Sequence, residues 1–189
     1  MMLFFCVNLS IEILLKPMKK IVAIIFLFFL TSHFFGQKVN WISFDEAVKL
    51  TKENPKPMLI DVYTDWCGYC KKMDRITYNN EIISSYINEN FYPVKLDGEQ
   101  REDLIYKDYT FKYQSSGRKG YHEFAAALLN GKLSYPTTVF MDEELGILDR
   151  VPGYLSPDIM EQVITYFAEK KYKTETWQDY IKGFVSNLK

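Results

Sequence analysis

The chain has 189 residues, of which 48% are hydrophobic and 25% are charged, so it can bury an apolar core and is not intrinsically disordered. Its length suits one domain of ordinary size with a short extension, because domains cluster at roughly 100 to 150 residues. A net charge of -1 provides no positive field for a polyanion, which argues against a nucleic-acid partner.

The first 36 residues have the pattern of a targeting segment. Three lysines within residues 16–20 precede an unbroken run of ten apolar residues, 21–30. That run fits the apolar part of a signal peptide and is too short to span a membrane, which takes roughly 20 apolar residues. We therefore expect a signal peptide at 1–36, with Met18 as an alternative start, or an amino-terminal anchor if the leader is not cleaved. The protein is then periplasmic or secreted.

Helical and strand patterns alternate over the rest of the chain, residues 38–189. A capping box at 43–46 opens the first helix, and the apolar run 58–63 predicts a buried strand that contains Asp61. In chain order we expect helix 43–54, strand 58–63, helices 67–78 and 81–89, strand 91–96, a strand at 105–113, a loop at 115–120, helix 121–129, a hairpin of 137–141 and 147–151, and helices 156–169 and 177–185. This order predicts an α/β fold, with a central mixed sheet between helices. We expect a single domain, with residues 173–189 as a short C-terminal helical extension.

Only two cysteines follow the leader, Cys67 and Cys70, in a Cys-x-x-Cys spacing. They come directly after the buried strand and open a helix, so both sulfurs lie within bonding reach. The free amides at the helix start stabilise the thiolate of Cys67, which is the expected nucleophile. A zinc site needs four ligands, and the only histidine after the leader is His122, so we expect no metal. A purely structural disulfide is the alternative, but closing so short a loop removes little chain entropy.

These features resemble the thioredoxin superfamily, and within it secreted bacterial proteins of the thiol–disulfide interchange type. The resemblance rests on three separated segments, which are residues 61–71, residues 135–137 and Gly153. It implies a thioredoxin fold in which Pro136 follows a cis peptide bond beside the cysteines, and the backbone of Tyr135 offers hydrogen-bonding groups to an extended substrate. The substrate-binding residues that it implies are Trp66, Gly68, Tyr69, Tyr135 and Pro136.

Asp61 lies six residues before Cys67, where the family has a buried acid that helps to deprotonate the second cysteine. A carboxyl group inside an apolar strand has a raised pKa and can exchange protons near neutrality. We therefore expect Cys67, Cys70 and Asp61 to be the catalytic residues, with the redox-active disulfide in place of any added cofactor. Lys95 matches a lysine that lies near this acid in the family.

The dipeptide between the cysteines is Gly-Tyr where thioredoxin has Gly-Pro, and it resembles that of a periplasmic disulfide isomerase. The direction of electron flow is therefore open. The leading interpretation is a monomeric thiol–disulfide oxidoreductase that reduces protein disulfides and exchanges electrons with a membrane electron donor or oxidant. The alternatives are a disulfide isomerase or oxidant, and a non-enzymatic interaction module that keeps the cysteines as a static disulfide.

The 38 residues between Asp97 and Pro136 are more than thioredoxin needs, so residues 98–135 contain an insertion. We expect it to lie near the substrate groove and to shape partner choice. Tyr121 and His122 could reach the site from the predicted helix 121–129. A lone histidine on a helix, however, more often caps it or lies at its surface.

Overall fold

A four-stranded mixed sheet forms the centre of the computed structural model, which describes residues 38–117 and 119–188. The strands lie in the order β2, β1, β7, β8. β1 pairs in parallel with β2 and antiparallel with β7, which pairs antiparallel with β8. Their bounds are β1 Met58–Tyr63, β2 Tyr92–Asp97, β7 Thr137–Met141 and β8 Ile147–Pro152. The predicted mixed sheet is confirmed, whereas the predicted leader, residues 1–36, lies outside the described residues.

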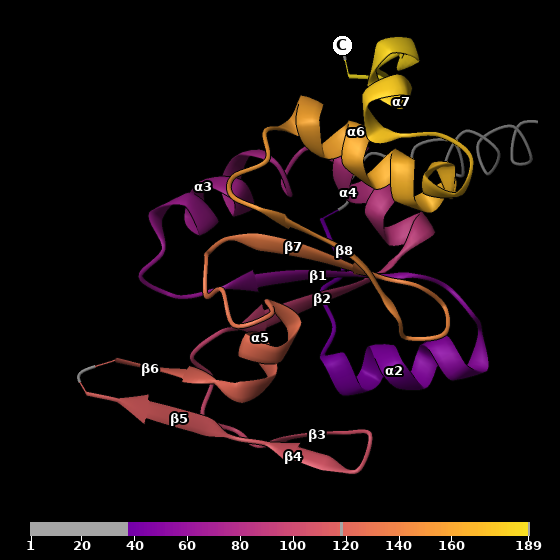
Figure 1. Cartoon of the computed structure of the whole chain (residues 1–189). Coiled ribbons are helices and arrows are strands. Elements are labelled where there is room, and N and C mark those ends of the chain that lie inside the picture. Colours follow the sequence, from indigo (N-terminus) through magenta and orange to yellow (C-terminus); the bar gives the residue numbers. More distant parts are fainter. Residues whose placement is uncertain (1–37, 118, 189) are drawn as a thin grey trace, which may run out of the picture. The chain divides into compact units, whose positions relative to one another are not determined.

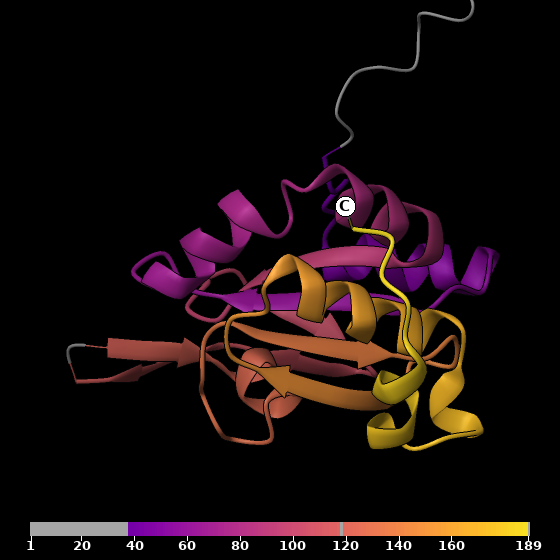
Figure 2. The ribbon, with the colours of Figure 1, turned by 90° about the horizontal axis from the view of Figure 1, so that it is seen from above.

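Helices cover both faces of this sheet (Figure 1). α3, α4 and α6 lie on one face, and α2 and α5 on the other, as the view from above also shows (Figure 2). Their bounds are α2 Phe44–Glu53, α3 Gly68–Ile76, α4 Glu81–Asn90, α5 Glu123–Leu128 and α6 Pro157–Ala168. In residues 38–117 and 119–188, no helix has the length and apolar character to cross a membrane.

Side chains of β1 alternate between two hydrophobic cores, one on each face of the sheet. Leu59 packs in the core that includes α3, α4 and α6, whereas Ile60 and Val62 pack in the core that includes α2 and α5. Because side chains alternate along a strand, Asp61 points to the same face as Leu59. The sheet therefore directs this carboxyl group toward the layer that contains α3.

The insertion differs from the prediction in its first half. The expected single strand at 105–113 is wrong, because the chain folds back at Lys107 and Asp108 into a hairpin. Both turn residues have a positive φ, 49° and 60°. Asn-Gly or Asp-Gly normally signals such a turn, and the sequence Lys-Asp does not. The strands of this hairpin are β3 Leu104–Tyr106 and β4 Tyr109–Phe111.

The second half of the insertion corrects two further expectations. Most of the predicted loop at 115–120 belongs to another hairpin, and the helix begins at Glu123 rather than at Tyr121. His122 is fully buried, and its Nδ1 accepts a hydrogen bond from the backbone N–H of Phe124 at 3.2 Å. It therefore caps α5 and does not reach the disulfide from a helix. The strands of this hairpin are β5 Tyr113–Ser116 and β6 Lys119–His122.

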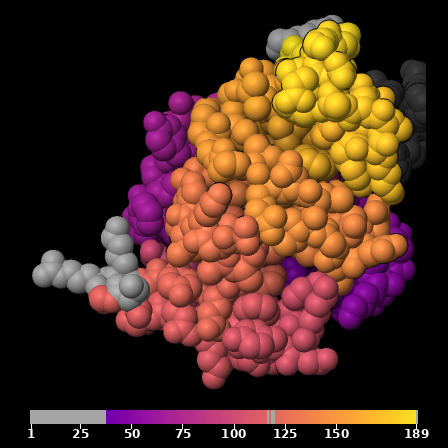
Figure 3. All heavy atoms as spheres, in the orientation of Figure 1, coloured from indigo at the N-terminus to yellow at the C-terminus, as the bar shows by residue number. Residues whose placement is uncertain are grey.

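The C-terminal extension packs against α6. It contains a 3₁₀ turn at Lys171–Lys173 and α7 at Trp177–Gly183, and Figure 3 shows it in yellow against the orange surface that includes α6. The buried carboxylate of Glu161, on α6, accepts hydrogen bonds from Ser186 Oγ at 2.5 Å and from the backbone N–H of Asn187 at 2.6 Å. These bonds hold the end of the chain on the domain.

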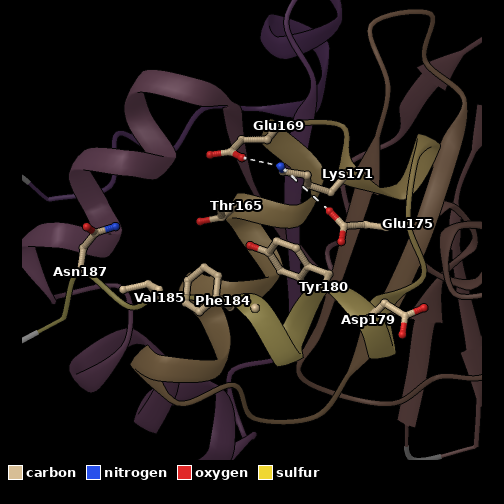
Figure 4. Close-up of a pocket in the computed structure, with 10 residues that line it drawn as sticks. Thr165, Glu169, Lys171, Glu175, Asp179, Tyr180, Phe184, Val185 and Asn187 are labelled. Atoms are coloured by element: carbon tan, nitrogen blue, oxygen red, sulfur yellow. Dashed lines mark ion pairs between the residues drawn. The ribbon is translucent and has the colours of Figure 1, made fainter.

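A surface pocket of about 340 Å³ lies between α6 and this extension (Figure 4). Lys171 lines it and forms ion pairs with Glu169 at 3.7 Å and Glu175 at 4.0 Å. Its positive charge is therefore already compensated within the pocket. No cysteine lines this pocket, so it is separate from the site that the sequence predicts.

Candidate active site

Cys67 and Cys70 form a disulfide at the amino terminus of α3. Cys67 is the N-cap residue, and its Sγ accepts a hydrogen bond from the backbone N–H of Cys70 at 3.0 Å. Cys67 is 5% exposed and Cys70 only 1%, and the first turn of α3 carries no acidic residue. The helix dipole and this N–H therefore stabilise a thiolate at Cys67, the more accessible sulfur, once the disulfide is reduced.

The peptide bond between Tyr135 and Pro136 is cis and lies at the same end of the sheet as the disulfide. The register pairs Thr137 with Val62, so the start of β7 lies beside the end of β1, from which the chain continues to the disulfide. The carbonyl of Pro136 accepts a hydrogen bond from the N–H of Gly153 at 2.8 Å. The three separated segments that carry the sequence resemblance thus meet at one end of the sheet.

Asp61 is the buried acid on the inner side of the site, with 1% of its side chain exposed. The β1–β2 register places it opposite Lys95, whose Nζ donates a hydrogen bond to its Oδ2 at 2.6 Å. Burial raises the pKa of Asp61, and the positive charge of Lys95, which acts in the other direction, does not cancel that rise. The predicted contact with Lys95 is confirmed, and the pKa of Asp61 shifts in the predicted direction.

Lys95 also connects Asp61 to a second acid, Asp74 of α3, which is 43% exposed. Burial on its own lowers the pKa of Lys95, but the two carboxylates outweigh it and the net shift is upward. Lys95 therefore stays charged and holds Asp61 in place. Three aromatic rings enclose the ammonium group at 4.9 to 5.3 Å from their centroids, those of Trp41, Tyr63 and Tyr78.

Aromatic side chains form the outer side of the site. Trp66 is 59% exposed and Tyr69 is 65% exposed. The ring of Tyr135, which is half-buried, meets Trp66 edge-on with 6.1 Å between the centroids. Exposed rings of this kind supply contact area to a partner at low cost in side-chain entropy. The outer side is therefore suited to binding another molecule next to the disulfide.

The insertion begins against this outer side. Trp66 Nε1 donates a hydrogen bond to Glu99 Oε1 at 3.0 Å. A Cβ at Gly98 would lie 2.5 Å from the Tyr135 hydroxyl, so only glycine lets the ring lie over the backbone there. Burial first, and then the charges of Glu99 and Asp97, raise the pKa of Tyr135 to about 12, so its hydroxyl stays protonated.

All of these residues, except Trp41, lie in the segment 44–168, which matches the family model of the thioredoxin-like domain. The chain belongs to this family. A thioredoxin from Thermus thermophilus has a similar structure, with a TM-score of 0.52 over 72% of this chain and 90% of that one, at 14% sequence identity. The expected thioredoxin fold is thus confirmed.

Relatives of this thioredoxin-like domain include much longer proteins. An uncharacterised protein of Caenorhabditis elegans is 31% identical over 84 residues, which are 44% of this chain and 12% of that protein. The thiol:disulfide interchange protein DsbD of Ralstonia nicotianae is 40% identical over 45 residues, which are 23% of this chain and 7% of that protein. The chain therefore spans only a small part of these curated relatives.

The structure brings most of the residues predicted for the site to one end of the thioredoxin-like domain. Gly68 and Tyr69 are both exposed between the cysteines, and a Cβ at Gly68 would meet no atom within 4 Å. Trp66 and Tyr135 touch each other across the outer side. His122 is the exception among the residues considered, because it is used as a helix cap.

Two residues of the site, Asp74 and Glu99, are not among those predicted from the sequence. Asp74 lies four residues after Cys70, and residues at this spacing share a helix face, so helical periodicity alone could have found it. Glu99 had no such signal, because its bond to Trp66 spans 33 positions and depends on how the chain turns after β2.

Proposed function

We propose that this thioredoxin-like domain protein is an extracytoplasmic thiol–disulfide oxidoreductase that reduces disulfides of other proteins. The observation that carries the proposal is the Cys67–Cys70 disulfide at the start of α3, with a buried acid on one side and exposed aromatic rings on the other. A disulfide that only stabilised the fold would gain little from so short a loop, and would need neither neighbour.

Catalysis starts from the reduced pair. The thiolate of Cys67 attacks one sulfur of the substrate disulfide, a mixed disulfide forms, and the other substrate sulfur leaves as a thiolate. Asp61 takes the proton of the Cys70 thiol, and the Cys70 thiolate then attacks the sulfur of Cys67. This second exchange releases the other substrate thiolate and restores the Cys67–Cys70 disulfide. Two electrons pass to the substrate, and its two thiolates take up one proton released by Asp61 and one from water.

Substrate contacts are assigned to the outer side. Cys67 is flanked in the chain by Trp66, Gly68 and Tyr69. Tyr135 and Pro136 lie at the same end of the sheet. These residues present exposed rings and the backbone before a proline, which suits a polypeptide segment better than a small polar ligand. Protein disulfides are therefore the proposed substrates.

Each turnover oxidises the cysteine pair, so a reductant must restore it. The leader pattern at 16–30 supports export, and disulfides form and persist outside the cytoplasm. A membrane electron donor is the class of partner that can deliver electrons to such a compartment. The protein acts as a monomer in this scheme, because each copy carries both cysteines and the buried acid.

The reduction potential of the cysteine pair tests the proposal. The full chain, with Cys6→Ser so that no other thiol interferes, is equilibrated with defined glutathione mixtures, and its free thiols are trapped. A potential near about -270 mV supports a reductant, and one above about -200 mV overturns that direction in favour of an isomerase or oxidant. A pair that exchanges with neither glutathione nor dithiothreitol would overturn the enzymatic proposal and leave a non-enzymatic interaction module.

A further inference from the structure

The β5–β6 hairpin is joined to the outer side of the site through Gly98. The carbonyl of Gly98 accepts a hydrogen bond from the backbone N–H of His122, the last residue of β6, at 2.7 Å. The same Gly98 lies under the ring of Tyr135, and the next residue, Glu99, holds Trp66. A continuous path of contacts therefore leads from the disulfide to one edge of β6.

The hairpin is anchored at its base. The carboxylate of Glu123 accepts hydrogen bonds from the backbone N–H of Lys112 at 2.8 Å and from Gln114 Nε2 at 2.7 Å. The guanidinium of Arg101 lies 4.6 Å from the centre of the Tyr113 ring. Both views show the hairpin projecting from the end of the sheet at which β1 leads into α3 (Figures 1 and 2). It is thus a fixed arm at the catalytic end of the domain.

One edge of this arm carries backbone groups with no strand beside them. Antiparallel pairing alternates, so the residues of a strand point their N–H and C=O groups toward and away from the partner strand in turn. The bond from His122 to Gly98 shows that the N–H of His122 points away from β5. Gly120, two residues earlier, therefore points its N–H and C=O out of the same edge. In the described part of the chain, β5 and β6 form a two-stranded sheet with no third strand.

We propose that the outer edge of β6 binds the extended segment of a protein substrate, which adds to the hairpin as a third strand while its disulfide reacts at Cys67. This inference rests on the proposed function, and it explains how the site would favour protein disulfides over small disulfides. Backbone donors and acceptors pair with any extended polypeptide, whatever its sequence. An isolated two-stranded hairpin is only marginally stable in water, so a third strand would stabilise the part of the arm beyond its anchored base. Because the edge is continuous with Gly98, a segment that lies across Tyr135 and Trp66 can extend onto it.

Shortening the hairpin tests this proposal in the full chain with Cys6→Ser. Deleting residues 115–116 and 118–119 removes two cross-strand pairs but keeps the register, and it leaves Gly117 and Gly120 as a two-residue turn, which suits a hairpin. Reduction of insulin and of oxidised glutathione is then compared. We expect kcat/KM for insulin to fall about tenfold, because one or two backbone hydrogen bonds to the substrate are lost. The kcat/KM for oxidised glutathione should stay within about twofold of the parent value.

The matched control is Ile105→Ser, which alters a side chain that is 66% exposed on the other hairpin of the insertion. It should leave both substrates unaffected. Equal rates for the shortened and parent proteins with both substrates would overturn the proposal, and so would a parallel loss with both. If the parent protein reduces neither substrate, the proposed function itself fails, which is a different result.

A trapped complex tests the contact directly. In the Cys70→Ser variant, also with Cys6→Ser, Cys67 is linked through a mixed disulfide either to a twelve-residue peptide with one central cysteine or to glutathione. We expect amide hydrogen exchange at Gly120 to slow at least about fivefold in the peptide adduct relative to the glutathione adduct, with no change in β3 and β4. Equal exchange at Gly120 in the two adducts would overturn the proposal.

Discussion

The two sides of the Cys67–Cys70 disulfide are built in opposite ways. On the inner side, Asp61 is 1% exposed, and its partner Lys95 is enclosed by aromatic rings. On the outer side, Trp66 and Tyr69 are more than half exposed. In the proposed mechanism, the group that accepts a proton lies where burial raises its pKa, whereas the rings assigned to partner contacts are left open to solvent.

The two sides also differ in the elements that supply them. Regular elements, β1, β2 and α3, place the inner residues. On the outer side, Tyr69 lies in the first turn of α3, whereas Trp66 and Tyr135 lie in loops against the first turn of the insertion. Rigid elements fix a proton acceptor to within a fraction of an ångström, whereas loops adapt to a partner. Changes on the inner side should therefore alter rate and pH dependence, and changes on the outer side should alter KM.

Replacing Cys67, which lies between the two sides, should have the largest effect on the rate of disulfide exchange. Cys67→Ser should reduce disulfide exchange at least about 1000-fold, because a serine hydroxyl is not ionised near neutral pH and cannot form a mixed disulfide. The assay is reduction of insulin by the full chain. Cys6→Ser is the matched control and should retain full activity. If Cys67→Ser kept more than a tenth of the activity, the site would lie elsewhere.

Removing the inner acid should have the next largest effect. Asp61→Asn should slow release of the mixed disulfide by about 10- to 100-fold at pH 7, because Cys70 loses the group that accepts its proton. The difference in rate between Asp61→Asn and the parent should become smaller as the pH rises toward the pKa of a free thiol, roughly 8.5, since hydroxide then deprotonates Cys70. Stopped-flow measurement of the second exchange step from pH 6 to 9 checks this.

The matched control for the inner acid is Asp65→Asn, which removes an exposed carboxylate two residues before Cys67. It should change the rate by less than about twofold, because exposed charges are well screened. If the rate of the second exchange step depended on pH in the same way in both variants, Asp61 would act only through its negative charge, as Asp65 does, and not as a proton acceptor.

Most residues of both sides were predictable from sequence, but the contacts that the insertion makes on the outer side were not. Asp61 interrupts an apolar strand, and Cys67 and Cys70 open a helix, so local pattern was enough to place them. The positions of Glu99 and Gly98 against Trp66 and Tyr135 depend on a turn that no local pattern marks.

The same reason explains the errors in the insertion. Lys107 and Asp108 take a positive φ without glycine, so an alternating aromatic pattern was read as one strand instead of two. The helix expected from Tyr121 begins at Glu123, because His122 is its N-cap; capping is a common role for a lone histidine, but Ser, Thr, Asp or Asn is the usual N-cap residue. Tertiary packing, which local sequence patterns do not contain, determines both the turn at Lys107 and Asp108 and the start of α5.

The buried charge of Asp61 should also lower stability at neutral pH. Because burial raises its pKa in the folded state, the folded protein binds this proton more tightly than the unfolded chain does. The free energy of unfolding therefore falls as pH rises from about 4 through the raised pKa. Asp61→Asn does not titrate, and Lys95 keeps Asp74 as a partner. The variant should gain about 1 kcal/mol over the parent at pH 8 and less at pH 4.

Urea unfolding of the oxidised proteins at the two pH values measures this difference. A gain that is the same at pH 4 and pH 8 would mean that Asp61 is not the titrating group. A loss of stability at pH 8 would mean that its bond to Lys95 outweighs the burial of its charge.

The smallest effect is expected from the outer side, where a single exposed ring is removed. Trp66→Ala should raise KM for insulin about fivefold and leave kcat within about twofold, because the ring contributes binding area and no proton transfer. Tyr109→Ala, which removes a ring 54% exposed on β4, is the matched control and should leave KM unchanged. A fall in kcat with constant KM would place Trp66 with the inner residues, because it would then act on the reacting sulfurs rather than on the partner. The division between a buried side that sets rate and an open side that sets recognition would then no longer hold.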